Sequence, residues 1–522
     1  MRISTPQFYS SSSANYERTF GNLNKTQQEA SDYIRVRTAA DDPVGYARLL
    51  QLEQQQNMLD QFKGNITNVR NALGSSESTL NAIGAVLQRV NELAMGSGNA
   101  GFTDADRKAN ASELASLEDQ LFSLMNSRDE NGKYLFSGSK GDTPPYVRNS
   151  DGTYSYQGDQ SQLMLQVGDM LSLAANETGY SAFEQALNTS RSETKQTAPL
   201  PDDGRVSLSN GQVSGSATYN DRFRSGEPYS IEFTSSTEYK ILDAGGNDVT
   251  LEASQGGKFD PKGDNISINF RGVDLRLKID FKPGDEGNPD AAIAGHTFSL
   301  SSKADSISGS RSPGNTSSEQ VTDAKITDPT AYKAAFPGGG AVLKFTSATD
   351  FELYAAPMTA DSRPISSGTL SGNTATAAGV SFELSGPPSA GDSFGVKVDT
   401  HQNQNVLNTI SQLRGALNTP QDHDSVARQA FLASLDSAIG NIASATSQVS
   451  SSISAIGGRG QALDVQAETN EALGIENTKT QGSIRDSDIG EVLMRLEMQK
   501  NQLTASMQSF AKISSLSLVN YI

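Results

Sequence analysis

Apolar side chains recur at alternating intervals of four and three residues near both ends of this chain, a spacing typical of long helices that pack side by side. Near the N-terminus, the positions with this spacing are Tyr16, Phe20, Leu23, Gln27, Ala30 and Ile34. Near the C-terminus, they are Val492, Leu496, Gln499, Leu503, Ser506, Phe510 and Ile513. Because the two patterns match, we expect the chain to fold back on itself and to pair its terminal helices.

A second helix is predicted to begin within the string DDPVG. Pro43 disfavours helix at Asp42 and suits the first turn of a new helix that Asp42 caps. Asp41, Asp42 and Pro43 therefore mark a hinge between two helices. The four-three spacing then continues to Ala94, and the glycine-rich residues 96–102 end the helix.

Helical spacing returns at residues 406–456, with an interruption at Thr419-Pro420. The string Gly-Gly-Arg-Gly at 457–460 predicts a kink in this helix.

The middle of the chain has a period of two, which is typical of β-strands. Strand-like strings within residues 134–167 alternate around a turn at Asp151-Gly152 and predict a small β flap on the helices. Residues 195–400 predict one or two all-β domains. Residues 303–330 are rich in Ser, Gly and Asp and predict a linker. An internal repeat aligns 231–242 with 343–354 and 272–285 with 379–392.

The predicted fold class is α+β: a long antiparallel helical coiled coil or bundle from both termini, with an inserted all-β region of repeated units. The predicted domains are a terminal coiled coil of 1–42 and 484–522, a helical rod with a β flap of 43–194 and 401–483, a first β repeat of 195–305, and a linker with a second β repeat of 306–400.

The terminal helices are expected to be disordered in the isolated monomer. Their apolar side chains are too few to offset the backbone entropy lost on ordering, and Gln and Ser interrupt both seams. We therefore expect these ends to order fully only among neighbouring subunits. An ordinary coiled coil within one chain is the alternative.

The sequence contains no recognisable catalytic constellation. His296, His401 and His423 lie in polar or turn sequence without a second ligand at helical or hairpin spacing, so we expect solvated histidines and no metal site. Cysteine is absent, which excludes disulfides and thiolate ligands. No nucleophile elbow, phosphate-binding loop or zinc-protease motif occurs in a suitable context. We expect neither an enzyme nor a bound cofactor.

The formal net charge of -18 disfavours nucleic acid and anionic lipid as partners. The start MRISTPQFYSSSSANY has no apolar signal region, and no stretch approaches ~18 uninterrupted apolar residues. We expect no cleavable secretory signal and no membrane span. If the protein leaves the cytoplasm, it must use a route that reads an uncleaved segment.

Several strings resemble the flagellin superfamily, and within it the proteins of the hook-filament junction. The strings are MRIST at 1–5, Phe8, AADDPVG at 39–45, YLFSGSK at 134–140, ETNEALG at 468–474 and SFAKISSLSLVNYI at 509–522. The chain reads SDYIRVRTAADD at 31–42, where a basic SGKRI-like string is common in the family. The central repeats lie outside the part that resembles the family.

The resemblance implies a structural adaptor in the bacterial flagellum, at the junction of hook and filament, that polymerises through its terminal helices and templates flagellin assembly. It implies an extracellular protein exported by the flagellar type III apparatus without a cleavable signal peptide. The implied partners are other copies in a ring, the first hook-associated protein, flagellin and a FlgN-like export chaperone. The expected subunit-interface residues are Phe20, Leu23, Ile34, Val492, Leu496, Leu503, Phe510 and Ile513, with Asp41, Asp42 and Pro43 as the hinge.

Two alternatives remain open. The first is a flagellin filament subunit, although the ending LSLVNYI and the DDP string favour the junction protein over flagellin, which commonly has LSLLR-like and DDA-like strings there. The second is a glycan-binding surface protein that uses the central β repeats.

Overall fold

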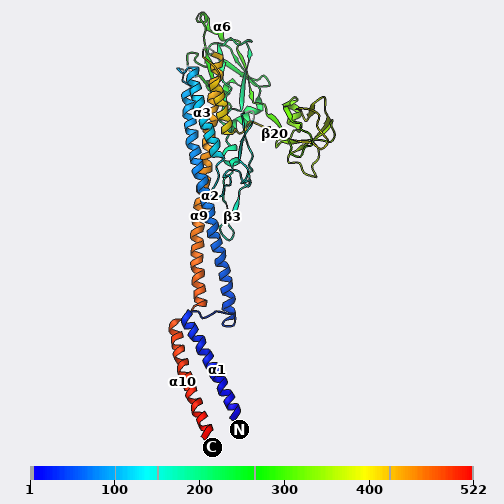
Figure 1. Cartoon of the computed structure of the whole chain (residues 1–522). Helices are drawn as coiled ribbons and strands as arrows, with labels where there is room; N and C mark the ends of the chain where they lie inside the picture. The colour runs from blue at the N-terminus through cyan, green and yellow to red at the C-terminus, as the bar shows by residue number, and fades with distance from the viewer. Residues whose placement is uncertain (1–4, 100, 150–151, 264–265, 423–424, 520–522) are drawn as a thin grey trace. The chain divides into compact units, whose positions relative to one another are not determined.

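A computed structural model of the protein describes residues 5–99, 101–149, 152–263, 266–422 and 425–519 (Figure 1). Its long helices are α1 Thr5–Asp32, α2 Pro43–Ser97, α3 Asp104–Met125, α8 Val406–Asn418, α9 Ser425–Arg485 and α10 Ile489–Val519. The chain divides into two compact units, the first with residues 1–73, 163–175 and 457–522 and the second with residues 74–162 and 176–456. Helices α2 and α9 contribute residues to both units.

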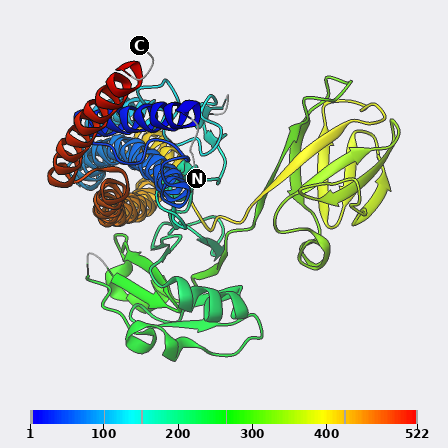
Figure 2. The same cartoon turned by 90° about the horizontal axis from the view of Figure 1, so that it is seen from below.

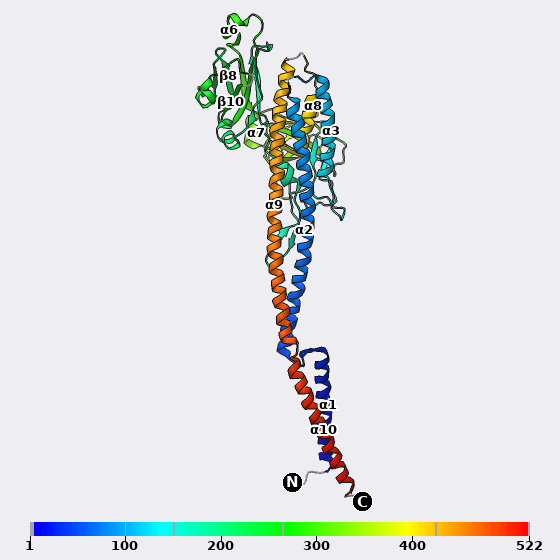
Figure 3. The ribbon, with the colours of Figure 1, turned by 90° about the vertical axis from the view of Figure 1, so that its left-hand side faces the viewer.

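In the first unit, α1 and α10 lie side by side (Figures 1 and 3). On α10 the shielded positions follow the predicted spacing. On α1 two positions differ, because Thr19 and Thr26 are shielded while Phe20 and Gln27 are exposed. Both choices fit 3.6 residues per turn, so the period alone does not fix which residues enter the seam.

The first unit also contains parts of α2 and α9 and a hairpin of β3 (Met164–Gln166) and β4 (Ser172–Ala174). Two asparagines hold the hairpin to the helices: the Asn65 Nδ2 group donates to the Gln166 carbonyl at 2.7 Å, and the Asn470 Nδ2 group donates to the Val167 carbonyl at 2.9 Å. The flap predicted from the sequence is thus two separate hairpins, one in each unit.

Residues 457–460, where the sequence predicts a kink or bend, do not end the helix, because α9 runs from Ser425 to Arg485 without a break. A glycine inside a helix costs only about 1 kcal/mol relative to alanine, and packing can outweigh it. Ile456 and Leu463, two helical turns apart, are both buried and hold this stretch in its helical seam.

In the second unit, α3 packs against α8 beside the hairpin of β1 (Tyr146–Arg148) and β2 (Tyr154–Tyr156). Thr103 caps α3 in a capping box with Asp106. A buried charge lies in this contact: the Glu118 carboxylate is 2.8 Å from Arg414 Nε of α8 and accepts the Tyr154 hydroxyl at 2.7 Å. The contact thereby joins α3, α8 and the hairpin.

The second unit also contains two β domains, drawn in green and yellow-green in Figure 2. The strands of the first domain form a sheet of order β5-β12-β8-β9 and a second sheet of order β10-β11-β6 with β7 on β11. The bounds of these strands are β5 Ser192–Ala198, β6 Val206–Leu208, β7 Gln212–Val213, β8 Tyr229–Phe233, β9 Tyr239–Leu242, β10 Ile266–Phe270, β11 Val273–Ile279 and β12 Thr297–Ser302.

The second β domain has a sheet of order β13-β20-β15-β16-β17 and another of order β14-β19-β18. The bounds are β13 Ser306–Arg311, β14 Val321–Ile326, β15 Ala341–Phe345, β16 Asp350–Ala355, β17 Ser366–Thr369, β18 Thr374–Ala377, β19 Val380–Leu384 and β20 Ser393–Asp399. Each domain has its own core of buried aliphatic and aromatic side chains.

The two β domains repeat one another in strand order and in register. The hairpin β8–β9 corresponds to β15–β16, and the last strands β12 and β20 pair with the same side of these hairpins. The equivalent opposed pairs are Ile231–Ile241 and Leu343–Leu353, and Phe298–Ile231 and Phe394–Leu343. The predicted α+β class with repeated β units is confirmed.

The same turn recurs between equivalent strands. Arg271-Gly272 and Ala378-Gly379 all have positive φ, which a two-residue type I′ hairpin requires at both central positions. A Cβ at residue 272 would lie 2.6 Å from the Gly215 carbonyl oxygen, so this turn also needs glycine for a close approach.

In each β domain the first and last strands pair with each other. Ser192 of β5 lies opposite Ser302 of β12, and Ser306 of β13 lies opposite Asp399 of β20. The chain therefore enters and leaves each domain at one place.

The prediction of a linker at 303–330 is wrong, because β13 and β14 occupy much of it. Its Ser and Gly residues serve close packing: a Cβ at Gly309 would lie 2.6 Å from the Val321 side chain of β14. Small residues in a strand permit such an approach, and composition alone does not distinguish them from a linker.

Candidate assembly surface

The pair of terminal helices is poorly buried for its length. Helix α1 has 28 residues and α10 has 31, yet the buried side chains among those described in the pair are only Thr26, Glu29 and Val492. Val492 is thus the single fully buried apolar side chain of the described part of this pair. An amphipathic helix normally gains its stability by burying a whole apolar stripe.

The expected interface residues are distributed between the seam and the outer surface. Val492 is 2% exposed, while Leu23, Ile34, Leu496 and Leu503 are half-buried. Phe20 and Phe510 are more open, at 45% and 41% exposure. The side chain of Ile513 lies outside the described residues.

Apolar side chains that the spacing did not indicate also reach the solvent. Besides Phe20 and Phe510, the exposed large apolar side chains of the pair are Ile489, Leu493, Met494, Met498 and Met507. Such a concentration on one helix pair is typical of a protein interaction surface, and methionine adapts to irregular partners. The methionines outside the seam were the sequence signal for it.

The connections between α1 and α2 and between α9 and α10 are joined to each other. The Arg35 amide donates to the Arg485 carbonyl at 2.7 Å, and the Ser487 amide donates to the Tyr33 carbonyl at 3.0 Å. The Arg35 side chain adds a bond from Nη2 to the Ile484 carbonyl at 2.7 Å. We call residues 33–42 and 484–488 the elbow.

Asp41 organises the N-terminal side of the elbow. Its carboxylate lies 2.5 Å from Lys25 Nζ and accepts the amide N–H groups of Arg37 and Thr38 at 3.2 and 3.1 Å. The Lys25 contact first, and these amides next, hold the pKa of Asp41 well below its usual range. The carboxylate therefore stays charged at every physiological pH.

Asp42 and Pro43 begin α2 as the sequence predicts. The Asp42 carboxylate accepts the Gly45 amide at 2.9 Å, and its carbonyl accepts the Tyr46 amide at 2.8 Å. Pro43 is the first residue of α2.

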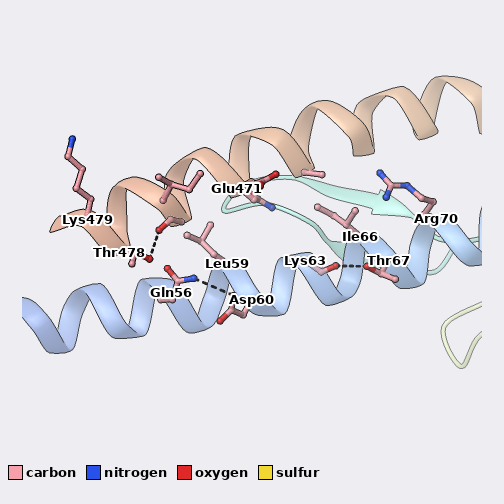
Figure 4. A pocket seen from close by; sticks show the side chains of 14 residues that line it. Gln56, Leu59, Asp60, Lys63, Ile66, Thr67, Arg70, Glu471, Thr478 and Lys479 are labelled. Carbon is pink, nitrogen blue, oxygen red and sulfur yellow. Dashed lines mark hydrogen bonds between the residues drawn. The ribbon is translucent and has the colours of Figure 1, made fainter. Parts of the chain in front are cut away.

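A groove of about 640 Å³ lies between α2 and α9 within the first unit (Figure 4). Its lining carries both signs of charge, with Lys63, Arg70 and Lys479 against Asp60 and Glu471. Because the two signs are mixed along it, the groove has no preference for one charged ligand.

The two histidines in the described part of the chain, His296 and His401, contact different groups. The prediction of a solvated His296 is wrong: the ring is buried, with Nε2 3.0 Å from the Asp203 carboxylate and Nδ1 2.8 Å from the Ile293 carbonyl. These two partners satisfy the ring inside the first β domain, which the local sequence does not reveal. His401 Nε2 lies 3.1 Å from the Ala304 carbonyl, and His423 lies outside the described residues.

Within the described part of the chain, no group of three or more His, Asp or Glu side chains is arranged to hold a metal ion. The helices of that part also include none with the length and apolar character needed to cross a membrane.

The family of the bacterial flagellin N-terminal helical region matches residues 3–141. The N-terminal helical part of the chain is thus similar to bacterial flagellins. It is 28% identical over 202 residues to flagellar hook-associated protein 3 of Salmonella typhimurium, covering 39% of this chain and 61% of that protein. It is 28% identical over 302 residues to a flagellin of Salmonella oranienberg, covering 52% of this chain and 56% of that protein. The match therefore spans less than two thirds of either relative.

A solved structure extends the likeness beyond the part of the chain that these sequences match. The crystal structure of flagellar hook associated protein-3 from Legionella pneumophila aligns over 83% of this chain and 98% of that one, with a TM-score of 0.52 and 20% sequence identity. At this identity the likeness concerns the fold.

Proposed function

We propose that this protein is a structural adaptor at the junction of the flagellar hook and filament, where copies assemble through α1 and α10. One observation carries the proposal: in a pair of helices with 28 and 31 residues, Val492 is the sole described apolar side chain that is fully buried. Further burial must come from contacts outside the monomer if the pair is to be strongly ordered.

The relatives support the position of the adaptor. The Salmonella protein is named for association with the hook, and the Legionella protein of similar fold carries the same name. A flagellin filament subunit is the competing proposal, since a flagellin also matches. Because both classes would use their terminal helices, location and polymer length are the properties that distinguish them.

The proposed partners follow from the exposed surface. Other copies of the chain would cover Phe20 and Phe510 in a ring, with the first hook-associated protein on one side and flagellin on the other. A FlgN-like chaperone would cover the exposed methionines of α10 before assembly, because a chain exported unfolded has to keep such side chains from aggregating. Export would proceed without cleavage of a signal peptide.

In this proposal Asp41, Asp42 and Pro43 are the hinge at which the terminal helices adjust on assembly. The network of Asp41 fixes the fold of the elbow, and few side chains hold the helices beyond it. The protein would run no reaction: its role is mechanical and rests on contacts between chains.

Deletion of the encoding gene tests the function. The expected phenotype is intact hooks without filaments, with flagellin released unassembled into the medium. Normal filaments on the deletion strain would contradict the proposal. If the purified protein extended filament seeds into long polymers, the flagellin alternative would replace it.

A further inference from the structure

Three basic side chains line one small pocket at the base of the first β domain. Arg191 precedes β5, Lys303 follows β12, and Arg224 lies on the short helical segment 216–226 before β8. The Lys303 amide donates to the Arg191 carbonyl at 2.8 Å, which fixes the two backbones beside each other. The pocket has a volume of about 190 Å³.

Arg191 is 5% exposed, which is unusual for a residue that is nearly always charged. Its guanidinium lies over the Tyr219 ring at 4.9 Å, and Nη2 donates to the Ser216 hydroxyl at 2.8 Å. Its Nε has no hydrogen-bond acceptor among the described residues. A buried guanidinium normally has a carboxylate partner, and this one has two neutral contacts instead.

The other two cations form no ion pair within the described structure, although the Glu193 carboxylate lies near Lys303. Arg224 is exposed and Lys303 is half-buried. Burial lowers the pKa of Arg191, and the nearby charge of Arg224 lowers it further. Burial also lowers the pKa of Lys303, against the opposing effect of the nearby Glu193 carboxylate. An anion in the pocket would relieve the repulsion between Arg191 and Arg224 and would offset the cost of burying Arg191 and Lys303.

One acid, Asp305, lines the pocket itself, but its carboxylate is engaged with another group, as is that of Glu227. The Asp305 carboxylate accepts the Tyr332 hydroxyl at 2.9 Å, and the Glu227 carboxylate accepts the Ser302 amide at 2.6 Å. Tyr332 belongs to the second β domain, at the position equivalent to Tyr219. The equivalent tyrosine thus contacts an acid in the second domain and a cation in the first.

We propose that this pocket binds a small oxyanion, either a phosphate or the carboxylate of an acidic sugar. Arg191, Arg224 and Lys303 would hold the anionic group, because charge-assisted hydrogen bonds to guanidinium and ammonium groups are the strongest available. The remaining lining includes the neutral side chains of Asn220, Thr400 and Gln402, which suit the hydroxyl groups of a sugar. A volume of about 190 Å³ is below the ~300–1,000 Å³ of pockets for drug-sized ligands, so the ligand is small.

Isothermal titration calorimetry on the full-length protein at constant ionic strength tests the site. The probes are inorganic phosphate, glucuronate and, as the neutral control, glucose. We expect saturable binding of phosphate, glucuronate or both at concentrations up to about 10 mM, and none of glucose. Binding of phosphate alone would identify the ligand of the pocket as a phosphate, and binding of glucuronate alone would identify it as an acidic sugar.

Arg191→Met risks unfolding the domain, so the test uses the more accessible cations. The double variant Arg224→Gln with Lys303→Gln should weaken binding by at least about tenfold. Lys278→Gln, which removes one exposed charge from β11 of the same domain, is the control and should bind as the wild type does. Absence of saturable binding by both acids, or equal binding by the double variant and the control, would overturn the proposal.

Discussion

The amide of Arg35 donates to the carbonyl of Arg485 at 2.7 Å, so the chain's N-terminal and C-terminal connections are bonded to each other at the elbow. Backbone bonds of this kind keep their geometry whatever the side chains are. The terminal helices α1 and α10 therefore leave the elbow from a fixed starting point, although few of their own side chains hold them together.

The first prediction concerns assembly. Met498→Glu places a charge on an exposed apolar position of α10, so the monomer should keep its fold while assembly is lost. Complementation of the deletion strain, scored by filament count, is the measurement. Gln508→Glu, at an exposed polar position of the same helix, is the control and should restore filaments. Full complementation by Met498→Glu would remove this methionine from the interface.

The second prediction concerns the elbow. Asp41→Ala frees Lys25 and the amides of Arg37 and Thr38, so hydrogen exchange at 33–42 should become faster while the start of α2, capped by Asp42, stays protected. Since the folded-state pKa of Asp41 lies below 3.8, its contribution is present above that pH and is lost as the pH falls through the lowered value. Unchanged exchange at 33–42 would contradict this role.

The third prediction concerns the buried charge between α3 and α8. Glu118→Gln leaves Arg414 without its ionic partner and should cost about 2–3 kcal/mol, less than for a dry pair because Arg414 is partly exposed. Glu113→Gln on the same helix removes only an exposed pair with Arg89 and should cost about 0–1 kcal/mol. Hydrogen exchange of α8 amides measures both changes. Equal losses of stability in the two variants would contradict a larger contribution of the buried ion pair.

The fourth prediction concerns pH. Asp392 is fully buried, and burial by itself raises the pKa of its carboxyl group. Hydrogen bonds from Ser317 and from the amides of Ser389 and Thr316 outweigh this effect and lower the pKa to about 2. Its contribution to stability is therefore present above pH ~4 and lost as the pH falls towards 2.

Asp392→Asn should cost about 1–3 kcal/mol at pH 7, because buried amides lose a charged acceptor. Exchange of β15 amides in the variant and the wild type should differ less at pH 3 than at pH 7. Asp361→Asn, at an exposed position, is the control. A difference that grows at low pH would have the wrong sign for this mechanism.

The fifth prediction concerns the repeated turn. Gly272→Ala adds a side chain at positive φ and close to the Gly215 carbonyl, so it should cost at least about 1–3 kcal/mol. Gly379→Ala should do the same in the second β domain, where the Asp328 carbonyl lies in the way. Gly287→Ala, where no atom lies within 4 Å, is the control. Local exchange at β10–β11 and β18–β19 reports each effect, and two tolerated substitutions would exclude the shared constraint.

The sequence predicts the elements of this fold better than their contacts. The spacing from Val492 to Ser506 predicts the seam of α10 correctly, because one apolar period determines one face of a helix. On α1, Thr19 and Thr26 lie in the seam while Phe20 is exposed. Two faces of α1 fit the helical period equally well, and contact with α10 determines which of them is buried.

The candidate sites show the same limit. Asp42 and Pro43 act within a few residues, so their cap could be predicted from the local string. The three cations of the pocket come from separate segments at 191, 224 and 303, and only the folded β domain brings them together. The strands within 303–330 were not predicted, because their Ser and Gly residues allow two strands to pack closely, and a Ser- and Gly-rich composition is equally typical of a linker.

The pairing of first and last strands has a consequence for how such chains vary. Ser192 lies opposite Ser302, and Ser306 lies opposite Asp399, so each β domain closes upon itself before returning the chain to nearly the point of departure. A domain of this kind can be inserted, duplicated or deleted, because the two ends of the remaining chain then lie close enough to be joined by a short connection. The sequence of the β domains can therefore change without altering the terminal helices, whose surfaces have to fit neighbouring subunits.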